Sequence, residues 1–299
     1  MKSLIPNIAL TAVLFASLAY GQQIAFTFDD GPDMTDAIGL NAEQRNTAIL
    51  AQLADAHLKS FLFVTRIDND PVRNALIRRW GEQGHLIGNH TATHPDLDEV
   101  SLKDYERDFL RCDQAISGMP GYTRRFRFPY LKEGNTREKR DGFRAFLDSN
   151  DYTTAPVSVD TSDWYYSNRL RDRLKLDPQA DRLRYRDVYL HHLDDRATYY
   201  ESLSHDVLGR SVTHVMLLHH NLINALFLSD VIRMFRDKGW TVINADIALQ
   251  DPVYAARPQV LPAGESILWS LAKARGLAHL RYPGEDDVYE KPLLDRLHL

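Results

Sequence analysis

Two adjacent aspartates, Asp29 and Asp30, follow an apolar run and precede a glycine and a proline. The run, residues 24–26, predicts a buried strand, and Gly31 with Pro32 predicts its abrupt end, which would leave both carboxylates at the carboxyl tip of the strand. Two like charges this close are unfavourable unless each finds its own cationic partner, a metal ion or an arginine. An isolated Asp-Gly-Pro is usually a solvated turn. Whether this one belongs to a functional site depends on which other polar residues accompany it in the chain.

Two histidines four residues apart, His90 and His94, form a second candidate cluster. This spacing lets both imidazoles face one ion when the segment coils through about one turn. Gly88 before and Pro95 after favour a coiled loop at a strand end over a long helix. Two such histidines alone are more often a polar surface turn. With a carboxylate from a neighbouring strand tip they would form a two-histidine, one-carboxylate metal site with positions open for water and substrate.

A third cluster, which runs from Arg127 to Tyr130, ends a strand-like segment. A guanidinium can hold a carboxylate by two hydrogen bonds and keeps its charge, so Arg127 could keep Asp29 ionised beside a metal-bound Asp30. Pro129 restricts the backbone in a way that could turn the amide of Tyr130 into the site as an oxyanion donor. The alternative for Arg127 is a surface position in the basic run that it ends.

Two later clusters combine an aspartate, a tryptophan and two histidines. Asp163 could hydrogen-bond one ring nitrogen of a histidine and raise the basicity of the other, and Trp164 offers a flat face to a sugar. A helix N-cap with a half-buried tryptophan explains this motif equally well. His219 and His220 follow the apolar Leu217 at a strand terminus, which suits a proton donor, although a lone histidine is more often structural. Only one of the two histidines can face inward.

Strand and helix patterns alternate along the chain, which indicates an α/β fold with a parallel sheet or barrel. The clusters above lie just after strands, where such folds place their sites. The predicted strands are 24–26, 60–64, 85–87, 125–128, 152–159, 214–218 and 240–243. The predicted helices are 41–57, 72–83, 101–118, 136–149, 222–238 and, in a proline-rich tail, 266–274.

Residues 165–213 are rich in arginine, aspartate and tyrosine and lack a clean strand pattern. They are interpreted as an insertion between two core elements. His191 and His192, which lie within it, are expected to belong to a local helix and not to the site.

The composition is that of ordinary globular material. The chain has 299 residues, 44% of them hydrophobic and 26% charged, which is enough for one large domain or two small ones. A formal net charge of -5 gives no support to nucleic-acid binding, and a neutral substrate fits better.

Residues 1–21 have the pattern of a secretory signal peptide. Lys2 precedes an apolar run over residues 8–18, and the small residues Ala19 and Gly21 mark a cleavage site. The run is too short for a comfortable membrane span, and no later segment is apolar enough for one. We therefore expect a soluble protein that is secreted or periplasmic. The single Cys112 excludes an internal disulfide and is expected to be a small buried hydrophobe.

Together and in this order, the sequences TFDDGP, HTATH, RFPY, DTSDW and LLH resemble the five motifs of the polysaccharide deacetylase superfamily. This is the NodB-homology domain of carbohydrate esterase family four. Each motif is weak alone, but the ordered set is highly specific and spans residues 24–246. The resemblance implies a distorted (β/α) barrel of parallel strands, with fewer strands than the eightfold barrel, over residues 22–250. Residues 251–299 would be a C-terminal extension that packs on it.

The resemblance also implies roles for individual residues. Asp29 would be the catalytic base, with Arg127 as its partner. A divalent metal ion, expected to be Zn²⁺ with Co²⁺, Ni²⁺ or Mn²⁺ as alternatives, would be held by Asp30, His90 and His94.

For the remaining motif residues the resemblance implies a general acid and the walls of a substrate pocket. Asp163 would orient His219, the acid, and the backbone of Tyr130 would stabilise the oxyanion. The residues that would shape the acetyl pocket are Trp164, Leu217 and Pro129. The chain departs from many members of the family at Leu131, where they have glycine, at His220, where they have aspartate, and in the 165–213 segment and the tail. These departures affect the substrate more than the chemistry.

The activity implied is that of a secreted, metal-dependent hydrolase that converts N-acetylglucosamine-type units of a glycan to free amine and acetate. Chitin-like polymers, peptidoglycan and exopolysaccharides are the candidate substrates. An O-deacetylase, such as an acetyl xylan esterase, is one alternative, and a carbohydrate-binding protein that has lost catalysis is another. The expected partner is an N-acetylated glycan, with no nucleic acid, no transmembrane segment and, by default, a monomeric state.

Overall fold

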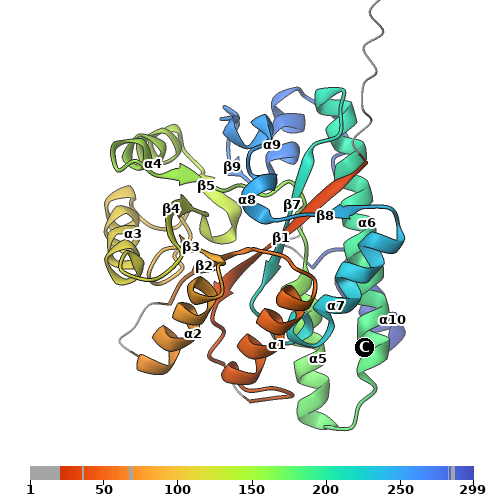
Figure 1. Cartoon of the computed structure of the whole chain (residues 1–299). Helices are drawn as coiled ribbons and strands as arrows, with labels where there is room; N and C mark the ends of the chain where they lie inside the picture. The colour runs from red at the N-terminus through yellow and green to blue at the C-terminus, as the bar shows by residue number, and fades with distance from the viewer. Residues whose placement is uncertain (1–20, 36, 67–69, 282, 284–286) are drawn as a thin grey trace, which may run out of the picture.

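The protein is described here by a computed structural model that covers residues 21–35, 37–66, 70–281, 283 and 287–299. The predicted signal peptide lies outside these residues, apart from Gly21. A curled sheet of parallel strands occupies the centre, and helices surround it as in an incomplete barrel (Figure 1). Its strands are β1 Gln23–Gly31, β2 Phe61–Val64, β3 Leu86–Asn89, β4 Tyr122–Phe126, β6 Thr153–Thr154, β7 Thr213–His219 and β8 Thr241–Val242.

The order of strands in the sheet is β6-β4-β3-β2-β1-β7, and β8 pairs with the first residues of β1. Every neighbouring pair in this sheet is parallel, which confirms the predicted fold class. The central pair, β1 and β7, is in the register that sets Asp29 beside His219. Because parallel strands end at the same edge, this register brings two motifs 190 positions apart to one place.

Ten α-helices are seen in the described part of the chain. They are α1 Ala42–Asp55, α2 Pro71–Glu82, α3 Leu102–Ile116, α4 Arg137–Ser149, α5 Asp163–Leu176, α6 Arg182–Leu208, α7 Leu222–Asp237, α8 Ala245–Ala248, α9 Ile267–Ala274 and α10 Glu290–Leu297. A short antiparallel pair, β5 Lys132–Gly134 and β9 Ala263–Gly264, joins the barrel to the tail, and two 3₁₀ turns cover Pro129–Leu131 and Pro252–Ala255. None of the described helices is long and apolar enough to cross a membrane.

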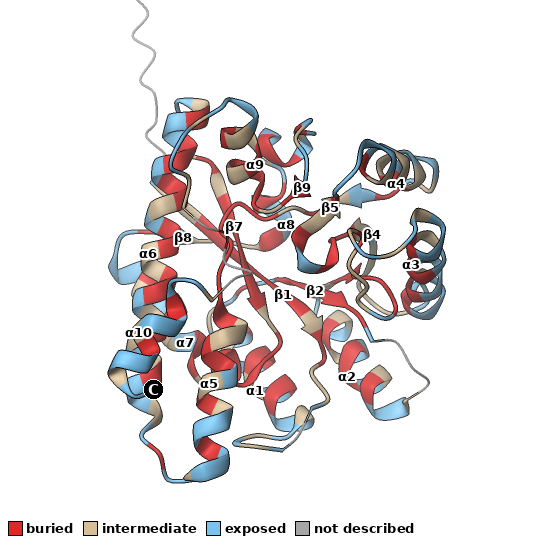
Figure 2. Ribbon diagram, turned by 180° about the vertical axis from the view of Figure 1, so that it is seen from behind, coloured by how far each residue is buried: buried red, intermediate tan, exposed pale blue. Residues whose placement is uncertain are grey.

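Local sequence explains why most helices begin where predicted. Asn41 caps α1: its side chain accepts from the amide of Gln44, and the Gln44 side chain accepts from the Asn41 amide. Ile49 and Leu53, one turn apart, bury the inner face of this helix against the sheet and α7. Figure 2 shows the same arrangement for the other helices, whose buried residues face the strands and whose outer faces are exposed.

Three predictions about the fold need correction. Strand β4 ends at Phe126, so Arg127 lies just beyond it. The strand predicted over 152–159 is seen only as the two residues of β6. After β6 the chain leaves β4 and crosses to β7, where Val159 forms an isolated bridge with Met216. In the tail α9 was predicted but α10 was not. Pro292 in its first turn suggested irregular structure, yet proline is tolerated at that position.

The segment predicted as an insertion is almost entirely helical. Helices α5 and α6 cover most of it and pack on each other and on α7. Their inward side chains belong to the main hydrophobic core, as Tyr166, Leu170 and Tyr189 show. His191 and His192 lie in α6, as predicted. The boundaries proposed for the deacetylase domain and the extension stay predictions.

A buried pair of side chains links α6 to β7 and is expected to make the stability of the fold depend on pH in the acid range. Glu201 lies 2.8 Å from Nε2 of His214 and accepts from the hydroxyl of Ser211. Burial raises the pKa of Glu201, but the hydrogen bond and charge of His214 and the bond from Ser211 outweigh it and lower the pKa to about 2. A carboxyl with a lowered pKa stabilises the fold above its unfolded-state pKa, and this stabilisation is lost as the pH falls toward the folded-state value.

We therefore expect the Tm difference between the wild type and Glu201→Gln to be largest near neutral pH. It should shrink as the pH falls from about 4.5, the ordinary glutamate value, toward 2. Thermal unfolding of both proteins, followed by circular dichroism with a chelator present, measures this. A Tm difference that stays constant from pH 6 to pH 2.5 would contradict it.

Candidate active site

The two aspartates at the end of β1 share a cavity but have different partners. Asp30 has a φ of 59°, outside the extended region, so the backbone turns there and both carboxylates reach the cavity. Asp29 is 2% exposed, and one of its oxygens accepts a 2.7 Å hydrogen bond from Arg127. Asp30 faces instead two imidazoles, with Oδ1 3.2 Å from Nε2 of His94 and 3.6 Å from Nε2 of His90. Nε2 of His90 also lies 3.8 Å from Oδ2 of Asp29. The two acids therefore differ in the direct hydrogen bond of Asp29 to Arg127 and in the contact of Asp30 with His94.

The residues around Asp30 fit a divalent metal ion. One ligand atom from each of Asp30, His90 and His94 lies within 4.8 Å of the others, and the buried Asp30 Oδ1 has no hydrogen-bond partner among the described residues. Burial lowers the pKa of both histidines, which keeps the imidazoles neutral and able to donate a lone pair. Burial opposes ionisation of Asp30, but its interactions with the nearby basic groups His94, His219, His90 and Arg66 outweigh it and lower its pKa. Two neutral nitrogens and one carboxylate oxygen match the ligands of a catalytic zinc site.

The loop after β3 holds the two histidines in position. Nδ1 of His90 donates to the carbonyl of Arg127 at 2.8 Å, which leaves Nε2 with its lone pair toward Asp30. The loop coils through residues with left-handed backbone, Thr91 at φ 63° and His94 at φ 59°. The amide of Thr91 donates to the side chain of Asn89, and the amide of His94 donates to the hydroxyl of Thr91. The predicted coiled loop at a strand end is confirmed.

Arg127 supports Asp29 from behind the cavity. Its guanidinium is 1% exposed and lies over the ring of Phe63, 4.1 Å from the centroid. Nη1 donates to Asp29 and to the hydroxyl of Thr27, and Nε donates to the carbonyl of Ala155. A two-bond contact with Asp29 was considered from the sequence, but only Nη1 reaches this carboxylate, and Nη2 makes no hydrogen bond within the described residues. Burial raises the pKa of Asp29 to about 6, against the lowering effect of Arg127, so this carboxylate is largely ionised at neutral pH and suited to accept a proton.

His219 carries a proton on the opposite side of the cavity. Its Nδ1 lies 2.6 Å from Oδ1 of Asp163, and its amide donates to Oδ2 of the same carboxylate at 2.7 Å. The side-chain Nδ2 groups of Asn221 and Asn224 also donate to Oδ2, which fixes Asp163. Burial lowers the pKa of His219, but the charge and hydrogen bond of Asp163 outweigh it and raise the pKa to about 10. A protonated imidazole in the cavity can act as a general acid.

The neighbouring His220 points away from the cavity and is held structurally. Its Nδ1 accepts from the amide of Asp33 at 3.1 Å, and its Nε2 donates to the side chain of Asn46 at 3.0 Å. The ring packs near Trp80 and is 1% exposed. The structure thus settles which histidine of the pair faces inward.

We expect His219→Ala to lower kcat by about 10²- to 10⁴-fold without a change in metal content, because it removes the imidazole that faces the cavity and could donate a proton there. His220→Ala should instead lower the Tm and leave kcat of the folded enzyme within about twofold, because it removes buried hydrogen bonds. Steady-state kinetics, elemental analysis and thermal unfolding of both variants measure these effects. Loss of turnover in His220→Ala with activity retained in His219→Ala would reverse the assignment.

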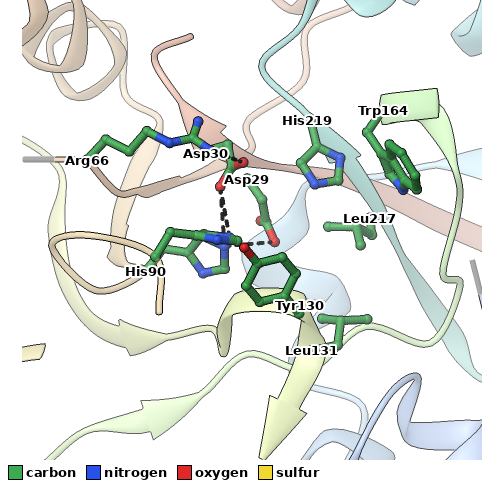
Figure 3. Close-up of a pocket in the computed structure, with 10 residues that line it drawn as sticks. Asp29, Asp30, Arg66, His90, Tyr130, Leu131, Trp164, Leu217 and His219 are labelled. Atoms are coloured by element: carbon green, nitrogen blue, oxygen red, sulfur yellow. Dashed lines mark ion pairs between the residues drawn. The ribbon is translucent and has the colours of Figure 1, made fainter. Parts of the chain in front are cut away.

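The cavity between these groups has a volume of about 260 Å³ (Figure 3). Its described walls are Asp29, Asp30, Arg66, His90, His94, Tyr130, Leu131, Trp164, Leu217 and His219. In Figure 3, His219 and Trp164 lie across the cavity from His90. The predicted residues Arg127 and Asp163 support the cavity without lining it. Pro129 is buried in the turn before Tyr130 and does not line the cavity, so its predicted substrate contact is not seen.

Tyr130 enters the cavity from a turn with unusual backbone. Its φ is 57°, and its ring packs edge-on against His94, 4.5 Å between centroids. Left-handed backbone at a bulky residue is costly and is found at functional sites. The proposed role of its amide as an oxyanion donor stays a prediction.

Two wall residues were not predicted from the sequence. Arg66 lies 3.6 Å from Oδ2 of Asp30, and its position two residues after the end of β2 was the available signal. Leu131 was noted only as a departure from the family pattern, yet it forms an apolar wall.

Comparison with known proteins finds a matching family model, related sequences and a related fold. Residues 19–145 match the family model for polysaccharide deacetylase. This part of the chain, which carries the first three motifs, is therefore similar to the polysaccharide deacetylase superfamily.

Two curated relatives and one solved structure give the range of similarity. A peptidoglycan-N-acetylglucosamine deacetylase from Bacillus cereus is 29% identical over 143 residues, 48% of this chain and 46% of that protein. A chitooligosaccharide deacetylase from Sinorhizobium fredii is 35% identical over 96 residues, 31% of this chain and 39% of that protein. The chain thus spans less than half the length of each. The chitin deacetylase structure from Colletotrichum lindemuthianum has the same fold, with a TM-score of 0.53, 22% identity and coverage of 77% of this chain and 89% of that one.

Proposed function

We propose that the chain is a metal-dependent hydrolase that removes acetyl groups from N-acetylglucosamine-type units of a glycan and yields a free amine and acetate. The observation that supports this best is the separation of the two acids at the end of β1. Asp29 is paired with Arg127 while Asp30 faces His90 and His94, and protonated His219 lies across the same cavity. A base, a cation site and an acid around one small cavity are the groups that hydrolysis of an amide requires.

A divalent ion held by Asp30, His90 and His94, with Zn²⁺ favoured by the donor set, would supply Lewis-acid chemistry when bound. Asp29 accepts the proton of the attacking water, and Arg127 keeps this carboxylate ionised beforehand. The acid His219 then protonates the departing nitrogen, and Asp163 keeps its ring oriented. The apolar walls Leu131, Leu217 and Trp164 suit the methyl group of the acetyl.

The named relatives favour an N-acetylated substrate over an O-acetylated one. One acts on peptidoglycan N-acetylglucosamine and another on chitooligosaccharides, by their names. An O-deacetylase would use the same base, acid and cation site, and an inactive carbohydrate-binding protein would not require all three. We further propose that the protein is secreted or periplasmic, supported by the signal-like sequence of residues 1–21.

Acetate release from a panel of glycans tests this function. The panel contains chitooligosaccharides, peptidoglycan glycan strands and acetylated xylan, each with and without a chelator. We expect acetate from an N-acetylated member, loss of release with the chelator, and recovery when Zn²⁺ is added back. Release from acetylated xylan alone would make the protein an O-deacetylase. Glycan binding without acetate from any member would favour the inactive protein.

A further inference from the structure

A chain of buried polar contacts runs from the C-terminal extension to the active site. It begins at Glu290, the first residue of α10, whose side chain is 1% exposed. Its Oε1 accepts from Nη2 of Arg196 at 3.0 Å and lies 3.4 Å from Nδ1 of His192, both on α6. The other ring nitrogen of His192 accepts from the amide of Ser162 at 3.0 Å. Helix α10 lies against α6 in both views of the molecule (Figures 1 and 2).

These contacts fix the tautomer of His192. The amide of Ser162 is a donor, so Nε2 of His192 must accept and carries no proton. The neutral ring then has its proton on Nδ1, toward the carboxylate of Glu290. Burial, together with the charges of Arg196 and Arg281, lowers the pKa of His192 well below its ordinary value, which agrees with a neutral ring.

The anchored amide belongs to the segment that carries the general acid's partner. Ser162 precedes the first turn of α5, and its own side chain makes no capping hydrogen bond there. The next residue is Asp163, which binds His219, and the residue after that is Trp164, a wall of the cavity. A shift of the backbone at Ser162 therefore moves both a positioning carboxylate and a substrate wall.

We infer that Glu290 is a positioning residue of the active site, which acts through His192 to hold Ser162 and thereby the Asp163 and His219 pair. This gives the C-terminal extension a role in the reaction and rests on the proposed function. Without an acceptor at position 290, the Nδ1–H of His192 would lose its buried partner, and the ring would no longer be held in the orientation that accepts from the Ser162 amide.

The test uses four variants of the full, zinc-loaded chain. Glu290→Ala removes the acceptor, and Glu290→Gln keeps an amide oxygen for His192. His192→Phe keeps a ring against Tyr166, which lies 4.8 Å away between centroids, but cannot accept from Ser162. Asp295→Asn is the control, because this residue docks the same helix α10 through Arg169 on α5.

Two readouts are compared at a temperature well below the Tm of every variant. The first is kcat and KM per bound zinc. The second is the far-downfield proton resonance of the short hydrogen bond between His219 and Asp163, assigned by its loss in His219→Ala. We expect Glu290→Ala and His192→Phe to lower kcat by about tenfold or more and to shift or broaden this resonance. Glu290→Gln and Asp295→Asn should stay within about twofold of the wild-type kcat and keep its resonance.

Unchanged kcat and resonance in folded Glu290→Ala and His192→Phe would overturn the inference, and so would an equal loss in Asp295→Asn. If Glu290→Ala does not fold, His192→Phe is compared with Glu290→Gln. The inference then holds only if His192→Phe loses kcat and the resonance while Glu290→Gln keeps both. If the wild type releases no acetate from any glycan, the proposed function fails, and the resonance alone still decides whether Glu290 positions His219.

Discussion

Replacing Asp29 with asparagine is expected to lower kcat by about 10²- to 10⁴-fold while the protein keeps its metal. The amide side chain is nearly isosteric and can still accept the hydrogen bond from Arg127, but it cannot take a proton from water. Because Asp29 is not one of the three residues grouped around the cation site, metal content should not change. Kinetics of acetate release and elemental analysis of the same sample measure both effects.

A nearby carboxylate supplies the matched control for this variant. Asp33 lies four residues further along, near Arg45 and outside the cavity walls. We expect Asp33→Asn to keep kcat within about threefold of the wild type, because the side chain does not line the cavity and asparagine keeps an oxygen for the amide of Thr35. Equal activity of Asp29→Asn and the wild type would remove Asp29 from the role of base.

Replacing Asp30 with alanine is expected to abolish metal binding and activity together. Its Oδ1 is the oxygen that both imidazoles approach, so removing it leaves only two nitrogen ligands. His90→Ala should have the same effect for the same reason. Both variants should contain less than about a tenth of the wild-type metal after dialysis, since a lost ligand costs more than a lost outer contact.

His205→Ala is the control for the histidine variant, because this side chain is about half exposed on α6, where it pairs with Glu201. It should retain metal and turnover. Full metal content and activity in His90→Ala would show that the ion is held elsewhere.

Residues at strand ends were predictable because local sequence marks where strands stop. The pair Asp29 and Asp30 stands before Gly31 and Pro32, and the histidine loop stands between a glycine and a proline. The alternation of strands and helices predicts a parallel sheet, whose strand ends meet at one edge. The register that sets Asp29 beside His219 is seen only in the structure. The cation cluster and the pairs Asp29 with Arg127 and His219 with Asp163 were thus within reach of sequence reasoning.

Features that depend on tertiary packing were not predictable. Helix α10 is eight residues long and has a proline in its first turn, so its pattern is weak, and its anchor Glu290 reads as an ordinary surface acid. His192 was correctly placed in a helix, but its contact with Ser162 requires the packing of α6 on the start of α5. The choice between His219 and His220 also needed the structure, because Asn46 and Asp33 hold the second ring away from the cavity.

The most direct measurement of the division between the two acids is anomalous diffraction at the zinc absorption edge from crystals of the zinc-loaded protein. We predict one strong peak in contact with Asp30, His90 and His94, with the carboxylate of Asp29 still bound to Arg127. A peak coordinated by Asp29, or no peak among these three ligands at full zinc occupancy of the protein, would contradict the account.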